Sequence, residues 1–280
     1  MQNINNQMQN INNTSLAKIF FYKDSFDEFV DELDFYNIIF AANGQFIALK
    51  SDFGISIDKI DSIKYTNSQL LPFESNMVIY SFVPKPSLSL FIEILEIFKY
   101  IYKECKAELC INVYYDKKEN KFHLNIINQI VTSVTTEYKY DEKFEMSEDY
   151  IRYLQIHSHN SIGANFSARD DHDEKLTALC YYGVVGKISE SSEFYNVESK
   201  FRIWNGIRFI EISLGDVFDL GVESKEIDCE TILKLDSIIE ISKQEIEKKK
   251  NLSKHKNINL NHTMYDFESS LFNISNLLEI

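Results

Sequence analysis

Proline and glycine are scarce in this chain, with 3 and 8 residues among 280. Both residue types are typical of linkers and turns, so their scarcity argues against long flexible linkers between several small domains. No apolar run reaches the length needed to cross a membrane. Residues 1–13 carry neither the basic nor the hydrophobic segment of a secretion signal. We therefore expect no membrane partner and a cytoplasmic protein.

Cysteine is also rare, and its four residues are Cys105, Cys110, Cys180 and Cys229. No two of them have the two-residue separation that is typical of metal-binding or redox pairs. Most of them lie within apolar segments, which predicts buried thiols in a reducing compartment.

Basic residues are fewer than acidic ones, 29 against 43, which gives a formal net charge of −14 and a pI near 4.9. Such a chain repels a phosphate backbone, so nucleic acid is not an expected partner. The excess of acid would favour a basic partner, but it is more often a means of staying in solution.

The remaining composition, 44% hydrophobic and 26% charged, is that of a globular protein with a sizeable core. We divide the chain into four parts. Residues 1–13 form a disordered low-complexity tail, 14–86 an α+β extension, 87–222 the main domain, and 223–280 a C-terminal helix and tail.

Hydrophobic periodicity predicts the elements of these parts. In the extension, 26–33 favours a helix, Asn43-Gly44 marks a hairpin between strands at 36–42 and 45–49, and 77–83 favours a strand. In the main domain, helices are predicted at 90–102 and 167–180, the latter with core contacts from Leu176 and Leu179. Strands are predicted at 107–115, 122–127, 130–136, 150–158, 181–188, 201–204 and 208–212, and a further helix at 232–250.

One stretch carries residue types that bind metal. His157 and His159 are followed by Ser167 and Asp170, in the pattern His-x-His-x7-Ser-x-x-Asp. On the predicted strand, the two imidazoles point to one side. Ser167 is suited to cap a helix that turns Asp170 back toward the histidines. Two imidazole nitrogens and one carboxylate oxygen make a hydrolytic zinc site with a position open for water, although two packed strand histidines are the simpler alternative.

This pattern resembles the JAMM signature of the JAB/MPN zinc metallopeptidases at every specified position. The surrounding run Ala164-x-Phe166-Ser167-Ala168-x-Asp170-Asp171-x-Asp173-Glu174 looks most like the bacterial JAB proteins of mobile elements and plasmids. The resemblance extends over about 87–214 and is absent over 223–280. It implies an α+β fold in which a mixed β-sheet is flanked by helices, with a cytidine-deaminase-like core and the α+β extension at its N-terminus.

The resemblance also implies a glutamate that acts as general base in the strand after the first helix. Glu108 occupies that place, although the glycine that usually follows a few residues later is missing from Glu108-Leu109-Cys110-Ile111-Asn112. Glu104 is the competing candidate. Ser167 either donates a hydrogen bond to the oxyanion or only caps its helix, and the two roles are compatible.

The expected function is therefore that of a zinc-dependent isopeptidase or peptidase. Its substrate would be the C-terminal tail of a ubiquitin-like or other protein. Two alternatives stay open: a non-catalytic JAB-type scaffold, and a zinc hydrolase that acts on a small non-peptide amide. The oligomeric state is not predicted.

Overall fold

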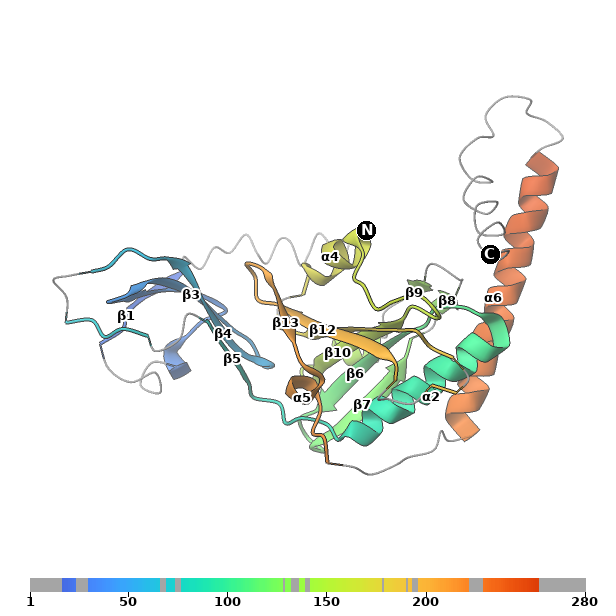
Figure 1. The fold of residues 1–280 in the computed structure, drawn as a ribbon, viewed down its shortest axis with the longest axis horizontal. Coiled ribbons are helices and arrows are strands. Elements are labelled where there is room, and N and C mark those ends of the chain that lie inside the picture. The colour runs from blue at the N-terminus through green and yellow to red at the C-terminus, as the bar shows by residue number, and fades with distance from the viewer. Residues whose placement is uncertain are drawn as a thin grey trace.

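Two mixed β-sheets form the framework of this α+β chain (Figure 1). The computed structural model describes residues 17–23, 30–65, 69–73, 77–127, 129–131, 136–138, 142–177, 179–189, 191–192, 196–221 and 229–256. The expected disordered tail at 1–13 and the chain beyond 256 lie outside the described residues. Among the described helices, none is both long and apolar enough to cross a lipid bilayer.

The N-terminal sheet has five strands in the order of the sequence. They are β1 (Lys18–Phe21), β2 (Tyr36–Ala41), β3 (Gly44–Lys50), β4 (Gly54–Asp61) and β5 (Met77–Ser81). β1 pairs with β2 in parallel and the other neighbours are antiparallel. The predicted hairpin is confirmed, but its two turn residues are Ala42 and Asn43, because Gly44 already pairs with Ala41. Of the helix expected at 26–33, residues 24–29 are not described and Val30–Glu32 form a 3-10 turn, η2.

The larger sheet has six strands in the order β13-β12-β11-β10-β6-β7. Their bounds are β6 (Cys110–Asp116), β7 (Lys121–Ile126), β10 (Tyr150–Ser158), β11 (Tyr181–Gly186), β12 (Glu198–Trp204) and β13 (Phe209–Ile212). β10 and β11 run parallel, and every other pair is antiparallel. β8 (Gln129–Val131) and β9 (Thr136–Tyr138) form a separate two-stranded hairpin where one strand was predicted at 130–136.

The two faces of the larger sheet differ in polarity, as strand alternation requires. One face packs its apolar side chains, such as Val113 and Ile156, against α2 (Leu88–Cys105), and α6 (Cys229–Lys256) adds Leu235 and Ile238 to the same core. The other face carries buried polar residues, among them Asn112, Gln155 and Arg202, and lies beneath α4 (Ala168–Glu174). The short helices α3 (Glu142–Glu145) and α5 (Leu214–Val217) complete the described set.

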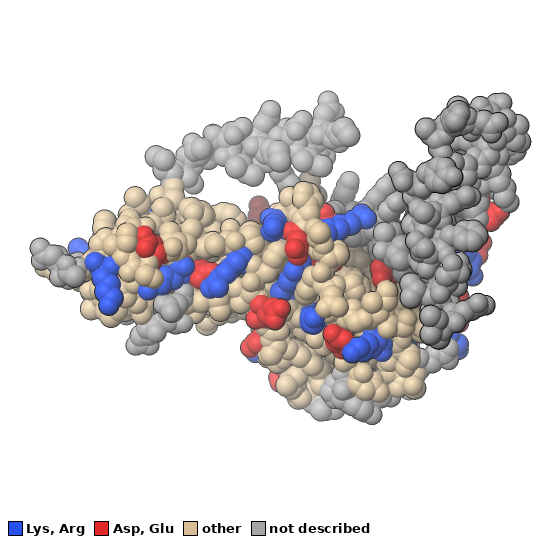
Figure 2. Space-filling view, turned by 45° about the horizontal axis from the view of Figure 1, so that its top comes forward, with Lys and Arg blue, Asp and Glu red and all other residues tan. Residues whose placement is uncertain are grey.

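The two sheets are joined by apolar and ionic contacts. Phe53, which precedes β4, packs its ring against Tyr153 and Tyr181 of the larger sheet at centroid distances of 5.9 and 4.8 Å. The buried carboxylate of Asp58 accepts hydrogen bonds from the Arg208 guanidinium at 2.7 and 2.9 Å and from the Asn205 amide at 3.0 Å. On the face drawn in Figure 2, basic and acidic side chains are mixed among uncharged ones.

Among the predicted boundaries that differ from the structure, two lie next to the proposed site residues. The helix expected at 167–180 ends at Glu174, Leu176 is 75% exposed, and only Leu179 reaches the core. Leu179 has a left-handed backbone with φ of 57°, which a helix does not allow, and its N–H donates to the carbonyl of Trp204 in β12 at 3.0 Å. The strand expected from 107 begins at Cys110, after Lys106 ends α2 in the left-handed region.

Candidate metal centre

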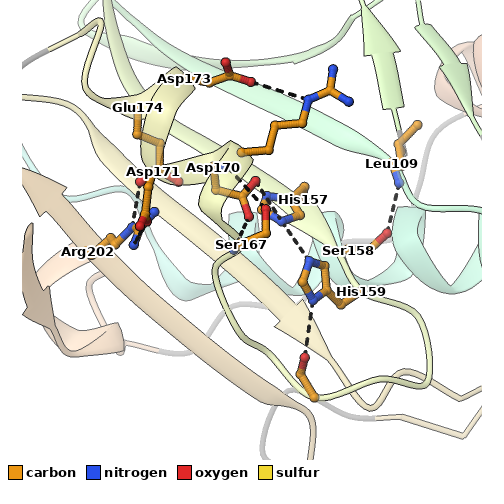
Figure 3. Close-up of polar contacts among 12 residues, drawn as sticks. Leu109, His157, Ser158, His159, Ser167, Asp170, Asp171, Asp173, Glu174 and Arg202 are labelled. Atoms are coloured by element: carbon orange, nitrogen blue, oxygen red, sulfur yellow. Dashed lines mark hydrogen bonds and ion pairs between the residues drawn. The ribbon is translucent and has the colours of Figure 1, made fainter. Parts of the chain in front are cut away.

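β10 positions the two histidines of the motif at the centre of the larger sheet. His157 lies on the strand and His159 just beyond its end, where its N–H donates to the Val185 carbonyl of β11 at 2.7 Å. The two Nε2 atoms are 3.1 Å apart (Figure 3). The other ring nitrogen of His159, Nδ1, lies 3.3 Å from the Gly163 carbonyl. A proton on this Nδ1 donates to that carbonyl and leaves Nε2 free as a ligand.

α4 brings the carboxylate of the motif to the same point. Its N-cap Ser167 accepts a hydrogen bond from the Asp170 N–H at 3.2 Å, and Asp170 Oδ2 accepts one from the Ser167 N–H at 2.6 Å. This capping box uses one carboxylate oxygen and turns the other, Oδ1, to within 3.8 Å of His157 Nε2. The capping residues predicted from the sequence therefore hold Asp170 in place.

The donor set fits a zinc ion. Ligand atoms of His157, His159 and Asp170 all lie within 4.8 Å of one another. Zinc bonds of about 2.0–2.1 Å at tetrahedral angles place neighbouring ligand atoms roughly 3.3 Å apart. The separations of 3.1 Å between the imidazoles and 3.8 Å between His157 and the carboxylate lie on either side of that value.

The same residues line a cavity of about 360 Å³ that also contains the other two predicted site residues, Glu108 and Ser167. Glu108 is half-buried in the segment between α2 and β6, whereas Glu104 is an exposed residue of α2 and is not part of the cavity wall. The loop after His159 forms another wall, with Ile162, Gly163 and Asn165.

Burial and charge shift the pKa values of these groups in different directions. Burial lowers the pKa of His157 to about 4, so its imidazole is neutral at neutral pH, as a metal ligand must be. For Asp170, burial alone would raise the pKa, but the neighbouring His157 and the hydrogen bonds of Ser167 outweigh it and lower the pKa. Burial, with a contribution from the Asp170 charge, raises the pKa of Glu108 to about 7. A carboxyl group with such a pKa can accept and release a proton near neutrality.

Beneath α4 lies a buried ionic cluster that the sequence reasoning missed. Arg202 of β12 donates to Glu174 Oε2 at 2.6 Å and pairs with Asp171 Oδ1 at 2.8 Å (Figure 3). Its guanidinium carbon lies 3.7 Å from the ring centroid of Phe166 and 3.8 Å from that of Phe209. The signal in the sequence was an arginine between the apolar residues of a predicted strand, which indicates a buried charge in need of a partner.

A second group of possible ligands, Asp116, Glu119 and His123, lies at the turn between β6 and β7. Asp116 Oδ1 already accepts the backbone N–H groups of Lys118 and Glu119 at 2.8 and 2.9 Å. Turn formation accounts for this arrangement, so we assign no metal to it.

Comparison with known proteins adds no family to this description. The chain matches no protein-family model and no curated protein. The resemblance to the JAB/MPN metallopeptidases therefore stays a prediction, and the function argued below rests on the residues of the site.

Proposed function

We propose that this protein is a zinc-dependent isopeptidase or peptidase of JAB/MPN type. In this proposal it hydrolyses an amide bond at the C-terminal tail of a ubiquitin-like or other protein. The observation that carries the proposal is the convergence of His157, His159 and Asp170 beside Glu108 in one cavity. A surface cluster of acids would not need two converging imidazoles, nor a half-buried carboxyl group with a pKa of about 7 next to them.

The three ligands and Glu108 divide the work of hydrolysis. When bound, zinc lowers the pKa of a water molecule toward neutrality and polarises the scissile carbonyl. Glu108 accepts the proton of the attacking water and later delivers it to the leaving amine, as its pKa near 7 permits. His159 keeps Nε2 available through the contact of its Nδ1 with Gly163, and the capping box keeps Asp170 directed at His157.

Ser167 has two compatible roles in this proposal. Its Oγ accepts the hydrogen bond of the Asp170 N–H, and its hydroxyl proton is donated to the Asp170 carboxylate when no substrate is bound. Because the exposed hydroxyl lines the cavity, that proton can be donated to the oxyanion that forms during attack. The helix cap thus directs the donor toward the reacting carbonyl.

The wall between His159 and Ser167 favours a narrow, extended substrate. Gly163 presents no side chain to the cavity, and a Cβ there would lie 3.3 Å from the Glu198 carboxylate. A peptide backbone can approach such a wall closely, which suits a tail that ends in small residues.

Metal analysis tests the site. The purified wild type should carry about one zinc per chain. The double variant His157→Ala, His159→Ala should carry none, while a variant of the exposed His172, His172→Ala, should keep it. Equal zinc in the wild type and the double variant would overturn the proposed centre.

Peptide hydrolysis tests the substrate class. Zinc-loaded protein should cleave a fluorogenic tail that ends in Arg-Gly-Gly faster than one that ends in Arg-Phe-Phe. A protein that hydrolyses small amides but neither peptide would favour the small-substrate alternative. A zinc-loaded protein that hydrolyses none of these would favour the scaffold.

A further inference from the structure

Arg202 is held by two acids and two aromatic rings, although it lies outside the motif. Its side chain is only 8% exposed, and that of its partner Glu174 is 5% exposed. Phe166 and Phe209 lie against the guanidinium at 3.7 and 3.8 Å from their ring centroids, so the group cannot swing out to solvent without breaking both contacts. The two acids that it binds, Asp171 and Glu174, belong to the helix that carries Asp170.

α4 depends on such contacts because it has only seven residues. A helix of this length is not stable by itself in water. The capping box fixes its first turn at Ser167, but a cap alone does not stop the helix from rotating about its axis. Successive residues of a helix are about 100° apart, so Asp171 lies about 100° and Glu174 about 40° around the helix from Asp170, both on the same side of it.

The acids of α4 meet partners on two different strands of the sheet. Asp171 and Glu174 meet Arg202 on β12, and Asp170 meets His157 on β10, two strands away in the sheet. We infer that Arg202 is a positioning residue, which fixes the rotation of α4 on the sheet and thereby aims Asp170 at the metal position. The inference rests on the proposed zinc centre and extends it to a residue that touches no ligand.

The chain offers a matched control. Arg152 of β10 forms a second arginine–glutamate pair with Glu145 of α3, with side chains 13% and 23% exposed. This pair resembles the pair of Arg202 and Glu174 in chemistry, but it does not involve α4. The test variants are Arg202→Met with Glu174→Gln, and Arg152→Met with Glu145→Gln, so that neither leaves a buried charge without its partner.

Zinc affinity is then measured by competition with a chelator, alongside the thermal stability of the zinc-free proteins. We expect the Arg202 double variant to bind zinc about tenfold more weakly, the loss typical of supporting residues around a metal site. The Arg152 double variant should remain within about twofold of the wild type. The single variant Arg202→Lys should have a zinc affinity between those of the wild type and the Arg202 double variant. Its ammonium group keeps the charge but lacks the planar fork that reaches both acids. If both double variants lose affinity equally, or neither does, Arg202 is not a positioning residue.

Two further measurements keep the test decisive. The variant Asp171→Asn removes one contact of Arg202 at a side chain that is 44% exposed. This variant should fold even if the double variant does not, and its zinc binding should be two- to threefold weaker.

Hydrogen exchange in the zinc-free protein should be faster in α4 of the Arg202 double variant and unchanged in α4 of the Arg152 control. A wild type that binds no zinc would overturn the proposed function, while this exchange difference still decides whether Arg202 holds α4. Unchanged zinc affinity in Asp171→Asn, or equal exchange, would overturn the inference.

Discussion

Ser158 and Leu109 bind each other through two hydrogen bonds, and this pair joins the histidine strand to the segment that carries Glu108. The Leu109 N–H donates to Ser158 Oγ at 3.0 Å, and the Ser158 N–H donates to the Leu109 carbonyl at 3.0 Å. Ser158 is 1% exposed and Leu109 is fully buried. Figure 3 shows the contact of Leu109 with Ser158. Because Ser158 lies between the two histidines and Leu109 follows Glu108, the pair sets the distance between the proposed ligands and the proposed base.

Ser158→Ala should therefore impair both stability and activity. The buried Leu109 N–H loses its acceptor, which costs about 1–3 kcal/mol in the free energy of unfolding. A shift of Glu108 relative to the ligands should lower the hydrolysis rate roughly 10- to 100-fold. The control is Ser81→Ala in the N-terminal sheet, where the lost hydroxyl accepts the Val83 N–H at 3.1 Å. Folded Ser81→Ala should hydrolyse at the wild-type rate, and an equal loss in both variants would contradict the role of the pair.

Glu108→Gln should separate metal binding from chemistry. The amide fills the same space but cannot take a proton from water, so hydrolysis should fall by about 10²–10⁴-fold. Zinc content should stay near that of the wild type, because Glu108 is not among the three converging ligands. The matched control, Glu104→Gln on the exposed end of α2, should leave the rate unchanged. A fully active Glu108→Gln protein would mean that another group is the base.

The stability of the metal-free protein should depend on pH through Glu108. The folded protein holds this proton up to a pKa of about 7, against an ordinary value of 4.5. The proton of Glu108 therefore adds to the free energy of unfolding below about pH 4.5, and this added stability is lost as the pH rises to about 7. Glu108→Gln has no such loss, so its stability relative to the wild type should grow over this range. The gain should level off at about 1–2 kcal/mol, less than the full shift implies, because the carboxyl is partly open to the cavity. Chemical denaturation at several pH values measures it, and a constant difference would count against the raised pKa.

Asp58→Asn should weaken the contact between the two sheets. The substitution removes the charge that binds the Arg208 guanidinium, and hydrogen bonds to charged groups contribute about 1.5–3 kcal/mol. The ion pair of Asp52 and Lys117 serves as a control, since the Asp52 side chain is 70% exposed. Asp52→Asn should cost less than about 1 kcal/mol. Denaturation curves that shift equally for the two variants would show that the buried contact adds no more to stability than the exposed ion pair does.

The parts of the fold that the sequence predicted depend on neighbours along the chain. The turn between β2 and β3, the apolar face of α2, and the two histidines at the end of β10 each follow from spacings of two to four residues. The cap of α4 is equally local, because Ser167 and Asp170 are three residues apart. Spacing alone was enough for these features.

The parts of the fold that the sequence did not predict depend on contacts between segments that are distant along the chain. Leu179 was expected in the helix of Asp170, but its N–H pairs with the Trp204 carbonyl of β12, 25 residues away in the sequence. Arg202 and Glu174 are 28 residues apart, so a helical spacing does not reveal their pairing. Charged residues in apolar strands indicate only that a partner exists, and the fold determines which one it is.

The loop between His159 and Ser167 rests directly on the backbone of β11. A Cβ at Gly186 would lie 2.3 Å from the Ile162 carbonyl oxygen and 2.5 Å from the Ala164 nitrogen, so the loop fills the space that this glycine leaves. The Lys187 and Ile188 N–H groups each donate to the loop at 2.7 Å. The seven unspecified residues of the motif thus form a segment that leaves the end of β10, crosses β11 and returns to the start of α4. Their number is fixed by this route, because a shorter or longer segment would bring a different residue to the place of Asp170.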